Sequence, residues 1–398
     1  MRILIINTFY YPKFVGGAEI SVQYLAEALV AERHKVFVIC IGDHQRIYRH
    51  NGVLIIQFKQ KNIYNTFTNK KRSALAKIVW HVVDSFNLIH FYTLSKIIDR
   101  INPDITNTNN IQGISPIIWK LIKNKRLKLV HTIRDYYLLC HKSILFQNGH
   151  PCDKLCIDCK ITHSLKKTFF KYPDHFIAIS DFVLNKHKQY GVIKTEANVI
   201  YNAVPTPTSQ YPKRQITTAG KVTLGYMGRL SFDKGFDFLV DELIALKSSV
   251  RQKIEVLFAG KGEDEKIQES SAKLHSINIK HSFLGVVKAN DFFSKIDVLI
   301  IPSLWFEPFG RVVIEALACG VPVCMSDRGG LMELYNSNCS WLFAPTNGEL
   351  TNKITEISDA PVLVLQKGGM GPQYAAKFSI SKNLAETSDV FYKVLLTD

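Results

Sequence analysis

The sequence predicts an α/β protein built from two doubly wound domains, each a parallel β-sheet covered by helices on both faces. At 398 residues, the chain is too long for one ordinary core. Short β-branched runs alternate with helical patterns in both halves, which is typical of parallel sheets. Between the halves, residues 204–212 are rich in Pro, Thr and Ser and polar residues follow to Gly220, a composition that favours a linker.

Short apolar runs mark the expected strands of both domains. In the first half these are Ile3–Asn7, Val36–Ile41, Val53–Phe58, Asp104–Asn107, Leu127–Thr132 and Phe176–Ile179. In the second half they are Val222–Met227, Ile254–Ala259, His281–Leu284, Val298–Pro302 and Val321–Cys324. A glycine cluster, 367–372, is expected to precede a last helix within 373–398. Domain boundaries are therefore predicted near residues 205 and 372.

The composition is that of a folded, soluble protein. Hydrophobic residues make up 46% and charged residues 21%, which suffices for two cores and argues against disorder. No stretch approaches the roughly 18 uncharged apolar residues that a membrane span requires. The N-terminal residues 1–7 resemble a short buried strand rather than a signal peptide. The expected location is therefore the cytoplasm.

The net charge of +16 lies entirely in the first half. Residues 1–205 contain 29 Lys and Arg against 13 Asp and Glu, whereas residues 206–398 contain 21 of each. Such an excess attracts phosphates of lipid headgroups, of a lipid-linked acceptor or of nucleic acid, although a solvated surface without a partner is the alternative. The stretch 77–98 is either an amphipathic element at an anionic membrane surface or a core-facing helix.

The most informative segment is 302–323, which has the pattern of a strand end, a turn, a helix and a following strand. Pro308 suits the first helical position and Gly320 suits the exit from the helix. Free N–H groups near Phe309 and Gly310 would then lie at the carboxyl ends of the strands. Open α/β sheets bind ligands there, and helix N-termini favour phosphate.

Two carboxylates and two cations surround this predicted anion site. Glu307 precedes it and Glu315 follows it, and carboxylates in these places can hold sugar hydroxyls. A second segment, 225–235, ends a strand in glycine and brings Arg229 and Lys234 to the same sheet edge, where they would neutralise a leaving diphosphate. The weaker backbone candidates for ligand contact are Gly228, Gly285 and Val286.

These segments resemble glycosyltransferase family 4, a large family of retaining enzymes with the GT-B fold. The resemblance rests on Gly-Arg-Leu at 228–230, Lys-Gly at 234–235 and Glu-x7-Glu from Glu307 to Glu315, and it extends over most of the chain. It implies two Rossmann-like domains around an interdomain cleft. The N-terminal domain, 1–205, would bind the acceptor and receive a crossing helix, 373–398, while the domain 206–372 would bind a nucleotide sugar.

The resemblance also assigns roles to individual residues. Arg229 and Lys234 would hold the diphosphate, Glu315 the ribose and Glu307 hydroxyls of the donor sugar, with Phe309 and Gly310 at the phosphates. The early glycines Gly16 and Gly17 precede a helix, and in the family this loop lies beside the donor phosphate and the acceptor. A plain strand-to-helix turn is the alternative for these glycines.

The segment 131–140 resembles a family stretch in which a histidine approaches the donor sugar, and here Arg134 stands at that histidine's position. A guanidinium cannot accept a proton, so Arg134 would position charge rather than act as a base. Arg134 and Asp135 are expected to be site residues. His131 is open between a functional role and that of a hydrogen-bonded histidine at a strand end.

The resemblance implies transfer of a hexose-type sugar from a UDP-sugar or GDP-sugar to a glycan or lipid-linked acceptor, with retention of configuration. Such an enzyme would serve cell-surface polysaccharide biosynthesis, in the cytoplasm or peripherally on the inner face of the membrane. The leaving diphosphate would take the acceptor's proton, so no protein nucleophile is needed. Because no Asp-x-Asp pair occurs in the sequence, catalysis is expected to need no divalent cation or other cofactor.

Two other classes of protein remain as alternatives. A nucleotide-sugar epimerase or a sugar phosphorylase also uses two such domains. A non-catalytic protein could instead bind nucleic acid through its basic half. The intact set of Arg229, Lys234, Glu307 and Glu315 argues against a decayed site, and no base-reading module accompanies the charge, so nucleic acid is not expected as a partner.

Four of the eight cysteines cluster in one segment, with the spacing C-x11-C-x3-C-x2-C. In a cytoplasmic chain, clustered cysteines favour metal ligands over disulfides. A structural zinc is the interpretation, and reduced, partly buried thiols are the alternative. His141, His150 and His163 lie nearby in the sequence. The expected ligands are Cys140, Cys152, Cys156 and Cys159.

Overall fold

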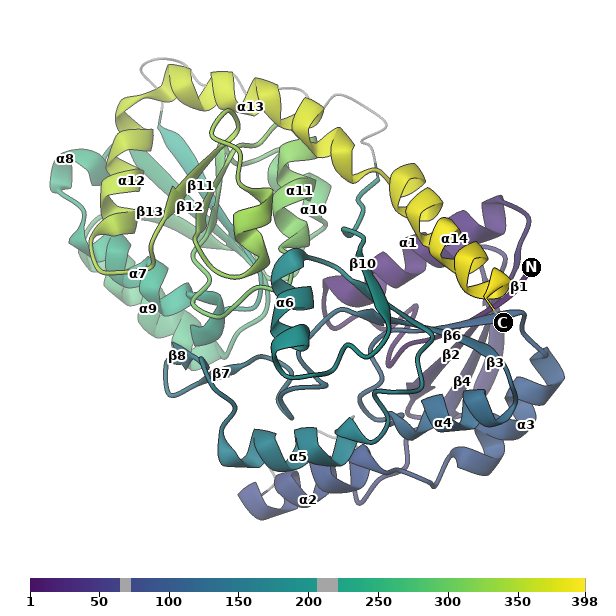
Figure 1. Ribbon diagram of the computed structural model, residues 1–398. Helices are drawn as coiled ribbons and strands as arrows, with labels where there is room; N and C mark the ends of the chain where they lie inside the picture. Colours follow the sequence, from purple (N-terminus) through teal and green to yellow (C-terminus); the bar gives the residue numbers. More distant parts are fainter. Residues whose placement is uncertain (65–72, 206–220, 398) are drawn as a thin grey trace. The chain divides into compact units, whose positions relative to one another are not determined.

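The computed structural model describes residues 1–64, 73–205 and 221–397 (Figure 1). The expected linker after Pro205 and the basic residues Lys70, Lys71 and Arg72 lie outside the described residues. The chain divides into two compact units. Unit 1 comprises Met1–Leu145, Cys152–Ala203 and Ile380–Asp398, and unit 2 comprises Phe146–Pro151 and Val204–Ser379.

Unit 1 contains an eight-stranded sheet with the order β10-β9-β6-β5-β1-β2-β4-β3. Its neighbouring strands are parallel, except that β3 and β4 pair antiparallel. The central β1 is almost wholly buried, as expected for a sheet covered on both faces. The strands are β1 (Arg2–Ile6), β2 (Lys35–Gly42), β3 (Arg46–His50), β4 (Val53–Lys59), β5 (Ile105–Thr108), β6 (Lys128–Ile133), β9 (His175–Ala178) and β10 (Glu196–Val199).

Helices α1 and α14 of unit 1 lie side by side (Figure 1). Val390 and Phe391 of α14 belong to the same buried cluster as Val22 and Leu25 of α1, so apolar burial holds the C-terminal helix on the N-terminal unit. The prediction that the last helix returns to this unit is confirmed. The helices are α1 (Gly17–Ala31), α2 (Ala74–Ser85), α3 (Phe91–Ile101), α4 (Ile117–Asn124), α5 (Ile157–Lys167), α6 (Asp181–Gln189) and α14 (Ile380–Leu396).

Unit 2 contains a six-stranded, all-parallel sheet with the order β13-β12-β11-β14-β15-β16. The chain reverses its direction of progress through the sheet between β11 and β14, and ligands of open α/β sheets bind outside the carboxyl ends at such a point. A separate two-stranded hairpin pairs β7 (Phe146–Gln147) with β8 (His150–Pro151). The sheet strands are β11 (Val222–Met227), β12 (Ile254–Ala259), β13 (Lys280–Phe283), β14 (Val298–Ile301), β15 (Val323–Ser326) and β16 (Ser340–Phe343).

The glycine cluster 367–372 lies inside a helix, α13, and not in a break before the last helix. Gly368 and Gly371 let α13 approach its neighbour closely, since a Cβ on either would come within about 2.6 Å of the backbone carbonyl of Gly320 or Leu317. A short 3₁₀ turn, Ala376–Phe378, follows, and α14 begins only at Ile380. The remaining helices of unit 2 are α7 (Phe236–Ala245), α8 (Ser248–Arg251), α9 (Asp264–Ser276), α10 (Ala289–Phe293), α11 (Arg311–Ala318), α12 (Glu349–Asp359) and α13 (Pro361–Ala375).

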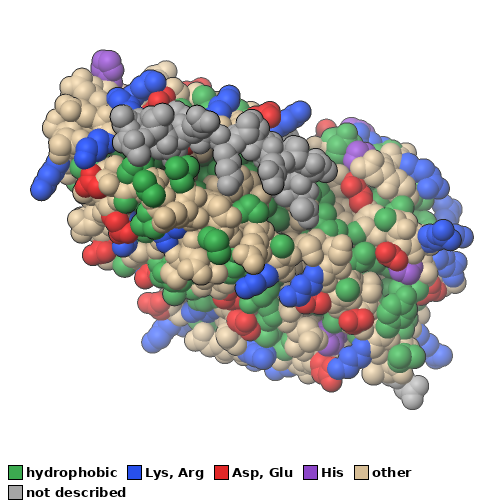
Figure 2. Space-filling model, turned by 90° about the horizontal axis from the view of Figure 1, so that it is seen from above, with side chains coloured by type: hydrophobic (Ala, Val, Ile, Leu, Met, Phe, Trp, Pro, Cys, Tyr) green, Lys and Arg blue, Asp and Glu red, His purple; other side chains and the backbone are tan. Residues whose placement is uncertain are grey.

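Within the described residues, every helix is too short or too polar to cross a membrane. On the face drawn in Figure 2, Lys and Arg side chains are scattered among acidic and apolar ones and do not form one continuous patch.

Candidate functional site

The loops that follow β11, β12 and β13 meet at the carboxyl edge of the unit 2 sheet. Gly260 N–H donates to the Gly285 carbonyl at 2.7 Å, and Gly228 N–H donates to the Ala259 carbonyl at 3.0 Å. Gly260 has φ +143°, and a Cβ there would lie 1.7 Å from the Gly228 carbonyl oxygen. Two of the predicted backbone contacts, Gly228 and Gly285, therefore lie on one continuous strip, and Val286, next to it, is 80% exposed.

Lys234 and Glu307 form an ion pair beside this strip. Lys234 Nζ lies 2.6 Å from Glu307 Oε1, and the Ser303 hydroxyl donates to the same oxygen at 2.7 Å. The ammonium also lies 4.4 Å from the centre of the Trp305 ring, close enough for a cation–π contact. Two distant stretches of sequence thus place a cation and a carboxylate in direct contact.

Backbone contacts hold the two stretches together. The Asp233 carbonyl accepts hydrogen bonds from the N–H groups of Leu304 and Trp305, at 3.0 and 3.1 Å. Gly235 has φ +72°, and a Cβ there would lie only 1.7 Å from the Pro302 carbonyl oxygen. Glycine after Lys234 is therefore required by both the left-handed conformation and the close approach.

Arg229 is the more accessible of the two predicted cations. Its Nη2 lies 2.7 Å from Asp233 Oδ2, while 54% of its side chain is exposed. Asp233 is also held by the Ser231 hydroxyl at 2.6 Å. An exposed guanidinium on a fixed loop can bind a phosphate without first leaving a buried environment.

Helix α11 begins at Arg311, three residues later than the proline pattern predicts. Pro308 is therefore not the first helical residue, because Glu307 pairs as a β-bridge with Gly329 and the backbone stays extended there. Gly310, at φ +99°, turns the chain into the helix. The Phe309 side chain is buried, and the centre of its ring lies 6.0 Å from that of the Phe378 ring. The expected exit at Gly320, φ +75°, is observed.

Glu315 lies on α11 and forms an ion pair with Arg311, one turn earlier. Burial raises the pKa of the Glu315 carboxyl, and Arg311 partly offsets the shift. Both side chains are mostly buried, with 17% and 12% exposed. Sequence reasoning missed Arg311, although its spacing of four residues from Glu315 is the usual signal of such a pair.

In unit 1, Gly16 and Gly17 lie at the start of α1. Gly16 precedes the helix, and its N–H donates to Glu19 Oε2 at 2.9 Å, so this backbone group already has an acceptor. Glu19 is almost fully buried, and burial raises the pKa of its carboxyl, while hydrogen bonds from the backbone and the charge of Arg134 act in the opposite direction. The glycines therefore position a buried carboxylate at the carboxyl edge of the unit 1 sheet.

Arg134 follows β6 and is buried among polar side chains of other loops. Its Nε donates to Asn109 Oδ1 at 2.7 Å and its Nη1 donates to Asn202 Oδ1 at 2.6 Å. Burial lowers the pKa of Arg134 to about 10, and Glu19 opposes the shift. The guanidinium therefore stays protonated at neutral pH. Sequence reasoning missed Glu19, Asn109 and Asn202, which have no motif of their own.

Asp135 and His131 differ in their surroundings. Asp135 accepts the Tyr137 N–H at 2.8 Å, and burial raises the pKa of its carboxyl to about 6. His131 is buried inside β6, with Nδ1 2.9 Å from the Thr108 hydroxyl and its ring 4.7 Å from that of Trp119. Burial lowers the pKa of His131 to about 3. These contacts place His131 in the core of the sheet.

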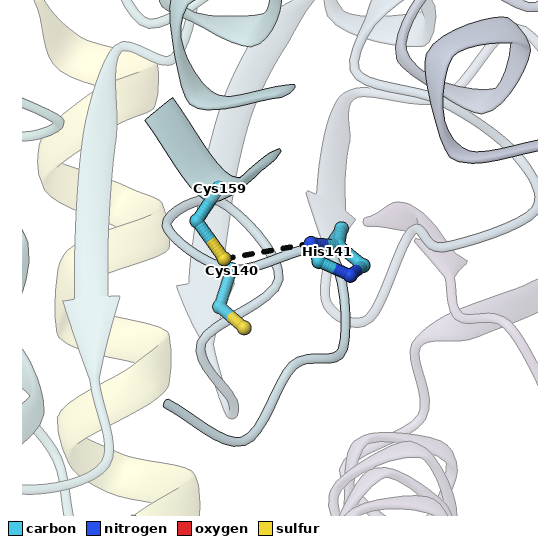
Figure 3. Close-up of side chains that lie close together, drawn as sticks. All are labelled: Cys140, His141 and Cys159. Atoms are coloured by element: carbon cyan, nitrogen blue, oxygen red, sulfur yellow. Dashed lines mark hydrogen bonds between the residues drawn. The ribbon is translucent and has the colours of Figure 1, made fainter. Parts of the chain in front are cut away.

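Two of the four clustered cysteines lie close to each other and to a histidine in the structure. Ligand atoms of Cys140, His141 and Cys159 all lie within 4.8 Å of one another, and all three residues are buried (Figure 3). Cys152 and Cys156, which the sequence also proposes as ligands, are half-buried and outside this group of three. This group of three therefore contains two of the four predicted cysteines together with His141, which the sequence places next to Cys140.

Two family descriptions match successive parts of the chain: Glycosyltransferase Family 4 over residues 15–207 and Glycosyl transferases group 1 over residues 209–365. A 42.6 kDa protein in the cps region of Klebsiella pneumoniae is 36% identical over 337 residues, which cover 84% of this chain and 87% of that protein.

Solved structures are similar over nearly the whole chain. A sucrose-phosphate synthase from Thermosynechococcus elongatus has a TM-score of 0.74 and 17% identity, covering 98% of both chains. Alr3699/HepE from Anabaena in complex with UDP has a TM-score of 0.71 and 18% identity, covering 99% of this chain and 100% of that chain. The two parallel sheets and the returning helix therefore define a GT-B fold. The chain belongs to glycosyltransferase family 4, whose members use nucleotide-sugar donors.

Proposed function

We propose that this chain transfers a hexose-type sugar from a UDP-sugar or GDP-sugar to a glycan or lipid-linked acceptor, with retention of configuration. The observation that carries the proposal is the contact between Lys234 and Glu307, beside the exposed Arg229. In a nucleotide sugar, the sugar hydroxyls lie next to the diphosphate. An adjacent cation and carboxylate can therefore bind the diphosphate and the sugar hydroxyls of the same ligand.

The proposed roles follow from this contact. Arg229 and Lys234 bind the diphosphate, Glu307 binds sugar hydroxyls and Glu315 binds the ribose. On this proposal, residues 206–372 form the donor domain, and residues 1–205 with the last helix form the acceptor domain. The remaining residues of the proposed donor site are Gly16, Gly17, Gly228, Gly285, Val286, Phe309 and Gly310, while Arg134 and Asp135 act on the acceptor side.

In the proposed reaction, the acceptor hydroxyl attacks from the face that the diphosphate leaves. The diphosphate takes the acceptor's proton, so the bond to the new oxygen forms as the bond to the old one breaks. Arg229 and Lys234 stabilise the charge that develops on the leaving group, which is the role often filled by a divalent cation. A place in cell-surface polysaccharide synthesis is supported by the relative from a cps region.

A panel of UDP- and GDP-sugars, screened by thermal shift, is expected to contain one donor that raises the melting temperature by several degrees. A ligand at 100 times its Kd adds about 2.7 kcal/mol to the stability of the folded state. Glu315→Ala is expected to weaken that donor by roughly ten- to one-hundredfold, since a hydrogen bond to a charged group contributes about 1.5–3 kcal/mol.

The matched control for Glu315 is Glu269→Ala. Glu269 also forms an ion pair with a cation one turn away on a helix, Lys273, but its side chain is 66% exposed and lies outside the site. The control should leave donor binding unchanged. If no nucleotide sugar shifts the melting temperature, or if both variants bind the donor equally well, the donor site is not where we place it.

The proposal includes a peripheral location on the cytoplasmic face of the membrane, supported by the loop between α2 and α3 together with the first turn of α3. Leu88, Ile89 and Tyr92 are 62%, 55% and 69% exposed. Two lysines flank them: Lys61 N–H donates to His90 in this loop, and Lys96 Nζ lies 4.3 Å from the centre of the Tyr92 ring. Exposed apolar side chains beside lysines suit an anionic lipid surface.

Leu88→Glu combined with Ile89→Glu is expected to lower co-sedimentation with vesicles of anionic phospholipid by at least tenfold at low salt. Removing apolar contacts and adding two negative charges both weaken binding to such a surface. Ile47→Glu, at a 66% exposed position of β3, is the matched control and should sediment like the parent chain. Absence of binding by the parent chain itself would contradict this part of the proposal.

A further inference from the structure

We propose that the loop after β6 and the start of α5 form a structural zinc site, with Cys140, His141, Cys159 and Cys156 as its four ligands. The site is separate from the proposed donor contacts of unit 2 and would bind its metal whether or not the chain transfers a sugar. The three buried ligands converge from two segments, the loop that carries Cys140 and His141 and the helix that carries Cys159 (Figure 3).

The spacing of the ligand atoms suits a tetrahedral metal. Cys159 Sγ lies 3.4 Å from His141 Nδ1, and all three ligand atoms lie within 4.8 Å of one another. Around zinc, with Zn–S near 2.3 Å and Zn–N near 2.0 Å, neighbouring ligand atoms are separated by about 3.5 Å. A small inward movement of side chains therefore completes the coordination geometry.

Cys156 is the best placed fourth ligand. It is the residue that precedes α5, three residues before Cys159, and its side chain is close enough to hydrogen-bond with that of Cys159. Two cysteines with this spacing are a usual half of a zinc site. Cys152 interacts with Cys140 and Cys156 only through longer-range charge effects. We therefore assign Cys156, not Cys152, to the fourth position.

The loop around Cys140 also presents hydrogen-bond donors to the sulfur of this ligand. Backbone N–H groups of Lys142, Ile144 and Leu145 lie within hydrogen-bonding reach of Cys140 Sγ. Backbone donors of this kind commonly support a metal-bound cysteine and orient it.

The metal would fix the loop that carries the acceptor-side residues. Seven residues beyond Cys159 along α5, the buried Lys166 donates to the Tyr137 carbonyl at 2.5 Å. Tyr137 in turn donates its hydroxyl to the buried Asp84 at 2.6 Å. Together, the zinc at one point of α5 and Lys166 at another would hold residues 134–141 against this helix, and with them Arg134 and Asp135.

The test is the metal content of the full chain, purified anaerobically, together with its absorption spectrum after Co²⁺ replaces the native metal. We expect one zinc per chain, and a Co²⁺ spectrum with the intense d–d bands of tetrahedral coordination and thiolate charge transfer. Cys140→Ser, Cys159→Ser and His141→Ala should each lower the zinc affinity at least tenfold. The half-buried Cys319→Ser of unit 2 is the matched control and should keep the metal.

Comparison of two further variants tests the fourth ligand: Cys156→Ser should lose affinity, and Cys152→Ser should not. Because a ligand variant can fail to fold, the parent chain is also stripped of metal by a thiol-modifying mercurial and reduced again. Addition of Zn²⁺ should then restore its melting temperature. A folded parent chain with neither zinc nor a Co²⁺ spectrum, or with a Cys140–Cys159 disulfide in anaerobic samples, would overturn the proposal.

Discussion

Lys234→Ala is expected to lower kcat/KM for sugar transfer by about 10²–10³-fold, the usual effect of removing one group that stabilises a developing negative charge. Lys234 is largely enclosed, with 22% of its side chain exposed, between Glu307 and the Trp305 ring. Because little water reaches the Lys234 ammonium, solvent cannot replace its charge when the side chain is removed. Steady-state kinetics with the donor identified by thermal shift measures the loss.

The control for this variant is Lys280→Ala, which removes an exposed lysine of the same unit that pairs with Glu255 at 3.0 Å. It should retain the parent rate. Brief treatment with excess chelator, under conditions in which the zinc content of the chain stays the same, should also leave the parent rate unchanged, because side chains carry the charge that a catalytic metal would otherwise neutralise. A chelator-sensitive rate that Mg²⁺ restores would assign this charge stabilisation to a cation and contradict the role of Lys234.

Hydrophobic patterning predicted the central strands well because parallel strands are buried on both faces. The predicted limits of Val222–Met227 and Ile254–Ala259 coincide with β11 and β12. The pattern failed at the sheet edges. Strand β3 alternates between half-buried and exposed residues, and its antiparallel pairing depends on a turn at Asn51-Gly52, both with positive φ. An Asn-Gly dipeptide is a strong hairpin signal, and β3 could have been predicted from it.

The candidate site likewise contains residues that a sequence motif indicates and contacts that only the fold brings together. Lys234 and Glu307 belong to segments that the motif marks, but their direct contact was not predicted. Arg311 offsets the charge of Glu315 locally and was detectable from its spacing. By contrast, Asn109 and Asn202 reach Arg134 from 25 and 68 residues away. No local pattern reports such contacts, because they depend on which loops share one edge of the sheet.

Arg134→Ala is expected to destabilise the chain by about 3–5 kcal/mol and to abolish measurable transfer. Removal of the guanidinium leaves the buried Oδ1 atoms of Asn109 and Asn202 without their donor, and each buried acceptor left unsatisfied costs about 1–3 kcal/mol. It also removes a positive charge that acts on the buried Glu19 carboxyl. Melting temperature and kcat/KM, measured on the same preparation, report the two losses separately.

Arg134→Lys is expected to recover part of the stability and little of the activity. An ammonium keeps the charge next to Glu19, but it lacks the planar set of donors that reaches Asn109 and Asn202 together. The double variant Arg134→Leu with Glu19→Gln tests the same point by removing both charges. No buried carboxylate then remains without a nearby cation. This double variant should be more stable than Arg134→Ala and remain inactive. If it regained transfer along with stability, Arg134 would be a structural cation and not a site residue, because its charge would have mattered only to Glu19.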